Sequence, residues 1–214
     1  MILMMVKISF PALIMVLVVA SFIGFCVENT FICLFSGRID NRNMVLPFLW
    51  GYGLALLAIL ALFGTPQAPK LFGREIRISG SQARTLYYFL ISFLCVCIGE
   101  IILGTIIERT CSIIWWDYSS LPLHLTRYTS VPTSIGFATL ITVFMKYVLI
   151  PLHNAFARIS LPILTLLASA CVLILSLDML NSLLYMIRNK STLKIWSYSL
   201  DKPILKIFKE RRNQ

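Results

Sequence analysis

The sequence contains few charged residues. Only 13% of its 214 residues are Asp, Glu, Lys or Arg, whereas 58% are hydrophobic. A soluble globular domain usually has about a quarter charged residues, so this chain has too little polar surface to cover an exterior in water. The composition therefore excludes a soluble globular protein and predicts a membrane protein. The length also excludes a large transporter made of two fused halves.

Acidic residues are scarcer still, with 9 Asp and Glu against 19 Lys and Arg, for a formal net charge of +10. In a soluble protein this excess would suggest nucleic acid. In an apolar chain it is typical of cytoplasmic loops and of contacts with anionic lipid head groups. We therefore expect the lipid bilayer as a partner, and no nucleic acid.

Several motifs of cofactor chemistry are missing. No two of the six cysteines have the Cys-x-x-Cys spacing of zinc or redox sites, and most lie within apolar runs, as packing residues do. The two histidines, His124 and His153, fall in different loops. The loop Gly-x-x-x-x-Gly-Lys-Ser/Thr is absent, so the chain cannot hydrolyse ATP by itself. We predict no disulfide, no metal and no cofactor.

Five long stretches are apolar enough to cross a bilayer, which requires about 20 residues of helix. Lipid offers the backbone no hydrogen bonds and no alternating barrel pattern is visible, so each stretch must be a helix. The first stretch stays apolar for too long to be a signal peptide. The predicted fold class is all-α: a polytopic membrane protein with a bundle of five transmembrane helices in residues 1–190 (about 8–35, 45–63, 85–107, 128–152 and 159–187) and a basic tail in 191–214.

The basic residues predict an orientation and a role for the tail. Five spans place the two ends of the chain on opposite sides, and 12 of the 19 basic residues fall on the side of the C-terminus. The positive-inside rule therefore favours a cytoplasmic C-terminus. After Pro203, apolar residues at helical spacing alternate with lysines, which predicts a short amphipathic helix on anionic lipid. A solvated tail that only fixes the topology is the alternative.

Four acids lie within or beside the apolar stretches: Glu28, Glu100, Glu108 and Asp178. A charge at the bilayer centre costs on the order of 3 kcal/mol on insertion scales, so such residues usually face a bundle interior or an aqueous cavity. Glu100 and Glu108 share one helical stripe with a glycine between them. Either this stripe lines a pathway, or each acid is protonated or paired for packing alone, which we favour for Asp178.

The sequence Gly-x-x-x-Glu-x-Thr occurs twice, starting at Gly24 and at Gly104. Each copy is followed by a polar, aromatic loop and then by a start of the next span that contains proline and glycine. The first four spans can therefore be two hairpins in the same orientation, as in transporters built from parallel repeats. Three matching positions also arise by chance.

Polar residues gather in the two loops that leave the first and third spans on the same face. The first loop carries Arg-Ile-Asp-Asn-Arg and the second Trp-Trp-Asp-Tyr-Ser. An aromatic belt at the interface explains the tryptophans, but not the polar density beside them. We predict a substrate pathway or ion-pair cluster formed by Glu28, Arg38, Asn41, Arg42, Glu100, Glu108, Trp116, Asp117, Tyr118 and Arg127.

These motifs match those of a known family from about Gly24 to Gly136, and the intact Trp-Trp-Asp-Tyr-Ser from Trp115 is the most distinctive. The other matching positions are Gly24, Phe25, Glu28, Arg38, Asn41, Arg42, Pro47, Tyr52, Gly53, Glu100, Glu108 and Pro122. The chain departs from the pattern at Asn43, Leu46, Leu49, Trp50 and His124. On these residues it resembles a divergent member of the ABC-transporter type IV permease family, small multi-pass bacterial membrane proteins.

The resemblance implies a permease-like component of a transport system in the bacterial plasma (inner) membrane. Such a component needs a separate ATPase subunit, or another copy of itself, to form a pathway. Two alternatives stay open. One is an intramembrane enzyme acting on a lipid or peptide, with Glu28, Glu108 or Asp117 as acid or base, although no nucleophile–base pair supports it. The other is a non-catalytic scaffold or regulator whose basic tail binds lipid or a partner.

Overall fold

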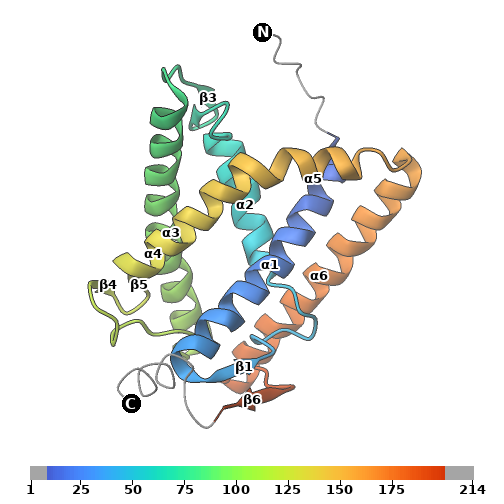
Figure 1. Ribbon diagram of the computed structural model, residues 1–214. Coiled ribbons are helices and arrows are strands. Elements are labelled where there is room, and N and C mark those ends of the chain that lie inside the picture. The colour runs from blue at the N-terminus through green and yellow to red at the C-terminus, as the bar shows by residue number, and fades with distance from the viewer. Residues whose placement is uncertain (1–8, 201–214) are drawn as a thin grey trace, which may run out of the picture.

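The computed structural model describes residues 9–200 and shows a mostly helical chain (Figure 1). The predicted amphipathic helix after Pro203 lies outside the described residues. The helices are α1 (Phe10–Ser36), α2 (Trp50–Phe63), α3 (Ser81–Cys111), α4 (Val131–Val143), α5 (Leu149–Phe156) and α6 (Leu161–Asn189), and a π-helical turn (Phe144–Val148) joins α4 to α5. The short strands are β1 (Arg38–Asp40), β2 (Lys70–Leu71), β3 (Arg74–Glu75), β4 (His124–Thr126), β5 (Thr129–Ser130) and β6 (Ser197–Ser199).

Four of these helical segments are long and apolar enough to cross a membrane: α1, α3, the continuous segment Val131–Phe156, and α6. They correspond to four of the five predicted spans, and the protein is an integral membrane protein. Proline in the first turn marks the start of α1, α4 and α6, where its missing N–H has no helical acceptor to lose. At the other end of α1, Gly37 adopts the left-handed conformation (φ 65°) that closes a helix.

The predicted span 45–63 differs from the other four. Only its second part is helical, because α2 has 14 residues and is therefore about 21 Å long. The preceding segment is not helical, and its backbone groups bond to other helices. The N–H groups of Val45 and Leu46 each donate to the Asp178 carboxylate of α6 over 2.9 Å, and Leu49 N–H donates to the Ser21 carbonyl of α1 over 3.1 Å. Pro47 lies in this segment, where its ring and missing N–H oppose a helix.

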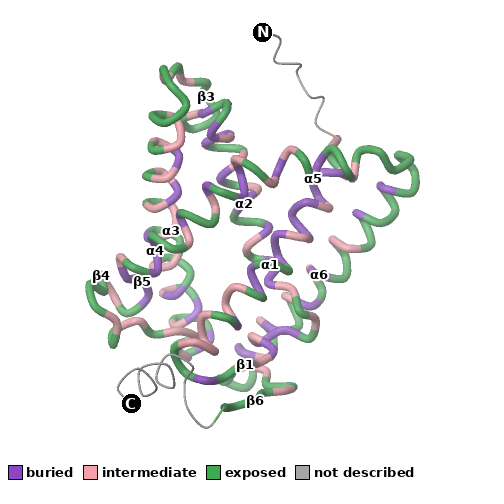
Figure 2. Tube along the Cα trace, viewed as in Figure 1, coloured by how far each residue is buried: buried purple, intermediate pink, exposed green. Residues whose placement is uncertain are grey.

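Helix α1 is the centre of the bundle. Helices α2, α5 and α6 all pack against it, while α3 packs mainly against α4. In α1, 56% of the most apolar 18-residue stretch is buried, against 22% in each of the other three long helices. Figure 2 shows this contrast between buried α1 and the exposed outer side of α6. The many exposed leucines and isoleucines of the outer helices face the lipid of an integral membrane protein.

The strands form three small antiparallel pairs at the two ends of the bundle. β1 pairs with β6 and β4 with β5 at one end, which we call the loop end, and β2 pairs with β3 at the opposite end (Figure 1). The β1–β6 pair joins the beginning of the predicted basic tail to the first loop. Beside it, the ring of Trp196 lies edge-on to Phe25 of α1 at 6.3 Å between centroids.

Candidate functional site

At the loop end, Glu28 of α1 is the centre of a partly buried charged group. Its carboxylate accepts a hydrogen bond from Tyr52 at the start of α2 (2.6 Å between oxygens) and pairs with the Arg42 guanidinium at 2.7 Å. Arg42 also pairs with Asp40 of β1 at 3.5 Å, and Asp40 accepts its backbone N–H. We call these four residues the Glu28 cluster.

Two backbone features allow this geometry. Tyr52 lies flat on Gly24, where an added Cβ would be 2.7 Å from the ring carbon Cγ. Arg42 itself has a left-handed backbone (φ 50°), which turns the chain so that its side chain points back to α1. Burial lowers the pKa of the Arg42 guanidinium, but Glu28 and Asp40 outweigh that effect and raise it, so the arginine stays charged.

A second group surrounds Glu108, near the end of α3. Its carboxylate accepts the hydroxyl hydrogen of Tyr128 and pairs with Arg127 at 3.1 Å. The Tyr128 ring covers Gly104, four residues before Glu108, as Tyr52 covers Gly24. Trp116 supports it by donating its indole N–H to the Tyr128 carbonyl over 2.8 Å. Glu108, Arg127 and Tyr128 form what we call the Glu108 cluster.

The two clusters repeat one arrangement. In each, a helical glycine is followed four residues later by a glutamate, a tyrosine from the next part of the chain covers the glycine and donates to the glutamate, and an arginine pairs with it. The sequence repeat at Gly24 and Gly104 thus corresponds to equal contacts in space. The clusters differ in exposure: the side chains of Arg42 and Glu28 are 15% and 24% exposed, whereas those of Arg127 and Glu108 are 46% and 40% exposed.

Tyr118 has neighbours in both clusters. Its backbone N–H donates to the Arg127 carbonyl over 2.7 Å, while its side chain lies near Glu100 and Glu28. Burial and those two carboxylates raise the pKa of the Tyr118 hydroxyl. The Trp-Trp-Asp-Tyr-Ser loop thus brings one phenol near an acid of α1 and an acid of α3.

Three other predicted site residues have different surroundings. Asp117 is exposed and accepts the backbone N–H of Ser119 over 2.8 Å, which makes a local turn. Arg38 is half exposed and pairs with Asp40 at 3.4 Å rather than with a glutamate. Asn41 is buried and bonds to the backbone of Leu193, which fastens the segment before β6. The predicted residues therefore do not form one cluster: Glu28 and Arg42 belong to the first, Glu108 and Arg127 to the second, and the other six lie outside the clusters or at their edge.

Sequence reasoning left out three residues that complete the clusters. Tyr52 and Tyr128 donate hydrogen bonds to the glutamate carboxylates, and Asp40 pairs with both Arg38 and Arg42. Each tyrosine follows its glutamate by 20 or more positions, at 24 for Tyr52 and 20 for Tyr128. That near-equal spacing was the available signal.

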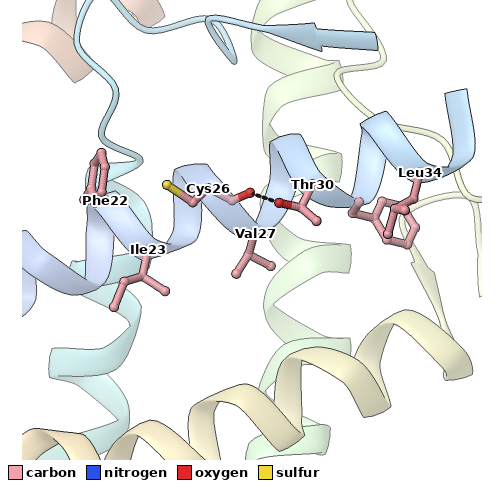
Figure 3. A pocket seen from close by; sticks show the side chains of 7 residues that line it. Phe22, Ile23, Cys26, Val27, Thr30 and Leu34 are labelled. Atoms are coloured by element: carbon pink, nitrogen blue, oxygen red, sulfur yellow. Dashed lines mark hydrogen bonds between the residues drawn. The ribbon is translucent and has the colours of Figure 1, made fainter. Parts of the chain in front are cut away.

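A separate groove of about 380 Å³ runs along α1 and is apolar. Figure 3 shows that its one hydroxyl, on Thr30, is directed to the Cys26 carbonyl of the same helix, at 2.8 Å. The groove offers lipid chains an apolar surface, and the exposed thiol of Cys26 is its one other heteroatom-bearing side chain. Within residues 9–200, no three His, Cys, Asp or Glu side chains come together as a metal site.

Comparison with known proteins gives one match. A family model described as "Putative ABC-transporter type IV" matches residues 15–183, which include both clusters, the whole of α2 to α5 and most of α1 and α6. The comparisons with curated proteins and with solved structures find no match.

Proposed function

Because the chain belongs to this family, we propose that it is the membrane subunit of an ABC-type transport system and works with a separate ATPase subunit. The family name and the apolar helices support a membrane component of this kind. A separate ATPase is required because the sequence has no phosphate-binding loop of its own. A single bundle of this size also needs either that subunit or a second copy to enclose a pathway.

The observation that carries the proposal is the pair of equivalent charged clusters at one end of an otherwise apolar bundle. Ionisable groups at membrane depth are expensive and usually belong to a pathway. Here two glutamates, each with a tyrosine donor and an arginine partner, stand on two different long helices, and Tyr118 lies between them. We propose that the substrate enters or leaves between α1 and α3, beside these clusters.

In this proposal the chain crosses the membrane five times. α2 with the extended segment before it forms the second crossing, since non-helical backbone is tolerated at membrane depth where protein groups satisfy it. Asp178 and Ser21 supply such groups. An odd number of crossings and the distribution of basic residues then favour a cytoplasmic loop end, on the side where ATP is available.

Co-purification tests the proposal. We expect the protein, extracted in mild detergent from its native membrane, to retain an ATPase subunit identified by mass spectrometry. Arg42→Gln and Arg127→Gln should reduce substrate-stimulated ATP hydrolysis, whereas Arg77→Gln, an exposed arginine at the opposite end, should not. Recovery of neither an ATPase nor an oligomer would contradict the proposal.

The orientation has its own test. Single cysteines are placed in a cysteine-free variant at Ser199, in β6, and at Arg77. A membrane-impermeant thiol reagent should label the Ser199→Cys variant only in inside-out vesicles and the Arg77→Cys variant only in intact cells. The reverse pattern would place the loop end outside.

A further inference from the structure

Glu100 differs from the other acids of the membrane-spanning helices because, among the described residues, neither a positively charged group nor a backbone N–H group pairs with its carboxylate. Glu28 and Glu108 each have an arginine and a tyrosine, and Asp178 accepts two backbone N–H groups. Within residues 9–200, Glu100 has no ion-pair partner, and its oxygen Oε2 is closed to solvent and accepts no hydrogen bond.

The depth of Glu100 makes this difference important. Helix α3 spans Ser81–Cys111, so its middle residue is Val96 and Glu100 lies about 6 Å beyond it along the axis. An unpaired buried charge is the costly case, since nothing repays its lost hydration. A carboxylate at this place therefore has to carry a proton or bind a cation.

The neighbours of Glu100 can serve a carboxylic acid. The hydroxyls of Thr129 and Ser134, both fully buried, lie beside the Glu100 carboxyl group as hydrogen-bonding neighbours. They also bond to one another at 2.9 Å, which uses one of their two hydroxyl hydrogens and leaves the other to turn to the carboxyl group. The titratable neighbours are Glu28 on α1, Tyr52 on α2 and Tyr118 in the loop.

From this geometry we propose that Glu100 is a proton-binding site inside the membrane, which exchanges its proton with the loop end past Tyr118. No basic side chain of the described residues competes for the carboxylate, and Glu28, already paired with Arg42, repels a second negative charge beside it. The inference deepens the proposed function, because it names a proton as an ion that transport is coupled to. The coupling of the proton to transport rests on the proposed function, whereas the binding of a proton by Glu100 does not.

Labelling with dicyclohexylcarbodiimide, which reacts with protonated carboxyl groups in apolar surroundings, tests the inference on the purified full chain without substrate or ATPase. We expect one adduct by intact mass, at Glu100 by peptide mapping. Labelling should fall about tenfold per pH unit above its midpoint, as the protonated fraction falls. Glu100→Gln should abolish the adduct, Glu100→Asp should restore a pH-dependent adduct, and Glu75→Gln, in the exposed strand β3, should change nothing.

Three outcomes would overturn the inference. Labelling at Glu28 or Glu108 in place of Glu100 would assign the proton to another carboxyl group. Labelling that stays constant from pH 5 to pH 9 would indicate a permanently protonated packing residue. Protection by sodium, but not by choline at equal concentration, would indicate a metal cation at this position. Because no transport is measured, failure here leaves the proposed function standing, and failure to find an ATPase leaves the proton site standing.

Discussion

Tyr52 donates its phenolic hydrogen to Glu28 across 2.6 Å while its ring lies against Gly24, one helical turn earlier on the same helix. The glycine provides the space and the glutamate provides the acceptor, so the two α1 residues together fix the start of α2. Tyr128, Gly104 and Glu108 do the same for α4.

The close approach of the tyrosines predicts a cost for adding one methyl group. We expect Gly24→Ala and Gly104→Ala to lower the free energy of unfolding by about 1–3 kcal/mol, because the new Cβ overlaps a ring. Gly99→Ala is the matched control in α3: nothing lies within 4 Å of its Cβ, so it should be neutral or gain up to about 1 kcal/mol of helix propensity. Chemical unfolding in mixed micelles measures all three, and equal effects would contradict the packing role.

The difference in exposure between the two ion pairs predicts that the buried pair contributes a larger coupling energy to stability than the exposed pair. Removing Arg42 leaves a mostly buried Glu28 unpaired, and we expect Arg42→Met to cost about 3–5 kcal/mol of stability. Arg127→Met, in the exposed pair, should cost about 0–1 kcal/mol. Double-mutant cycles with Glu28→Gln and Glu108→Gln give the two coupling energies. The idea fails if the Glu108 pair couples as strongly as the Glu28 pair.

Asp178 holds the extended segment before α2, and its replacement should loosen that segment. In Asp178→Asn, one carboxylate oxygen becomes an NH2 group that faces a backbone N–H, so we expect a loss of about 1–3 kcal/mol. Hydrogen exchange at Val45 and Leu46 should rise selectively. Asn189→Asp, near the end of α6, serves as the control, and unchanged exchange in the Asp178 variant would exclude the role.

Asp117 predicts a pH dependence outside the membrane. Hydrogen bonds from the hydroxyl and the backbone N–H of Ser119 lower the pKa of Asp117. A lowered pKa in the folded state means that the turn is fully stabilised above the unfolded value, about 3.9, and loses this stabilisation as the pH falls through the folded pKa. The carboxyl carbon shift of labelled Asp117 should therefore titrate below about 3.9. Ser119→Ala should raise that midpoint, whereas Ser112→Ala should not.

The helices could be predicted from the sequence to the extent that hydropathy determines them. Stretches such as 159–187 exceed the bilayer thickness and have only one possible structure in lipid, and α6 (Leu161–Asn189) confirms that prediction. The shortness of α2 could not be predicted in this way. Residues 44–49 are apolar whether helical or extended, and what satisfies the N–H groups of Val45 and Leu46 is Asp178, which is distant in sequence.

The candidate site shows a similar division. Helical spacing correctly placed Glu100, Gly104 and Glu108 along α3, since that depends on one helix alone. Which basic residue pairs with each acid depends on how the loops fold back on the helices. Arg127 pairs with Glu108, and Arg42 pairs with Glu28, in two separate clusters. The charge pattern predicts Asp117 among the ion pairs, but its carboxylate instead accepts the backbone N–H of Ser119, two residues later.

The bonds between Asp178 and the segment before α2 also set an order for biosynthesis. Val45 and Leu46 leave the ribosome more than 130 residues before the carboxylate that accepts their hydrogen bonds. Until α6 is made, these N–H groups have to be satisfied by water or by the insertion machinery, because bare lipid cannot do so. In the proposed five-span topology the second crossing is therefore completed last, and a chain truncated before α6 should be recognised by membrane proteases as unfinished.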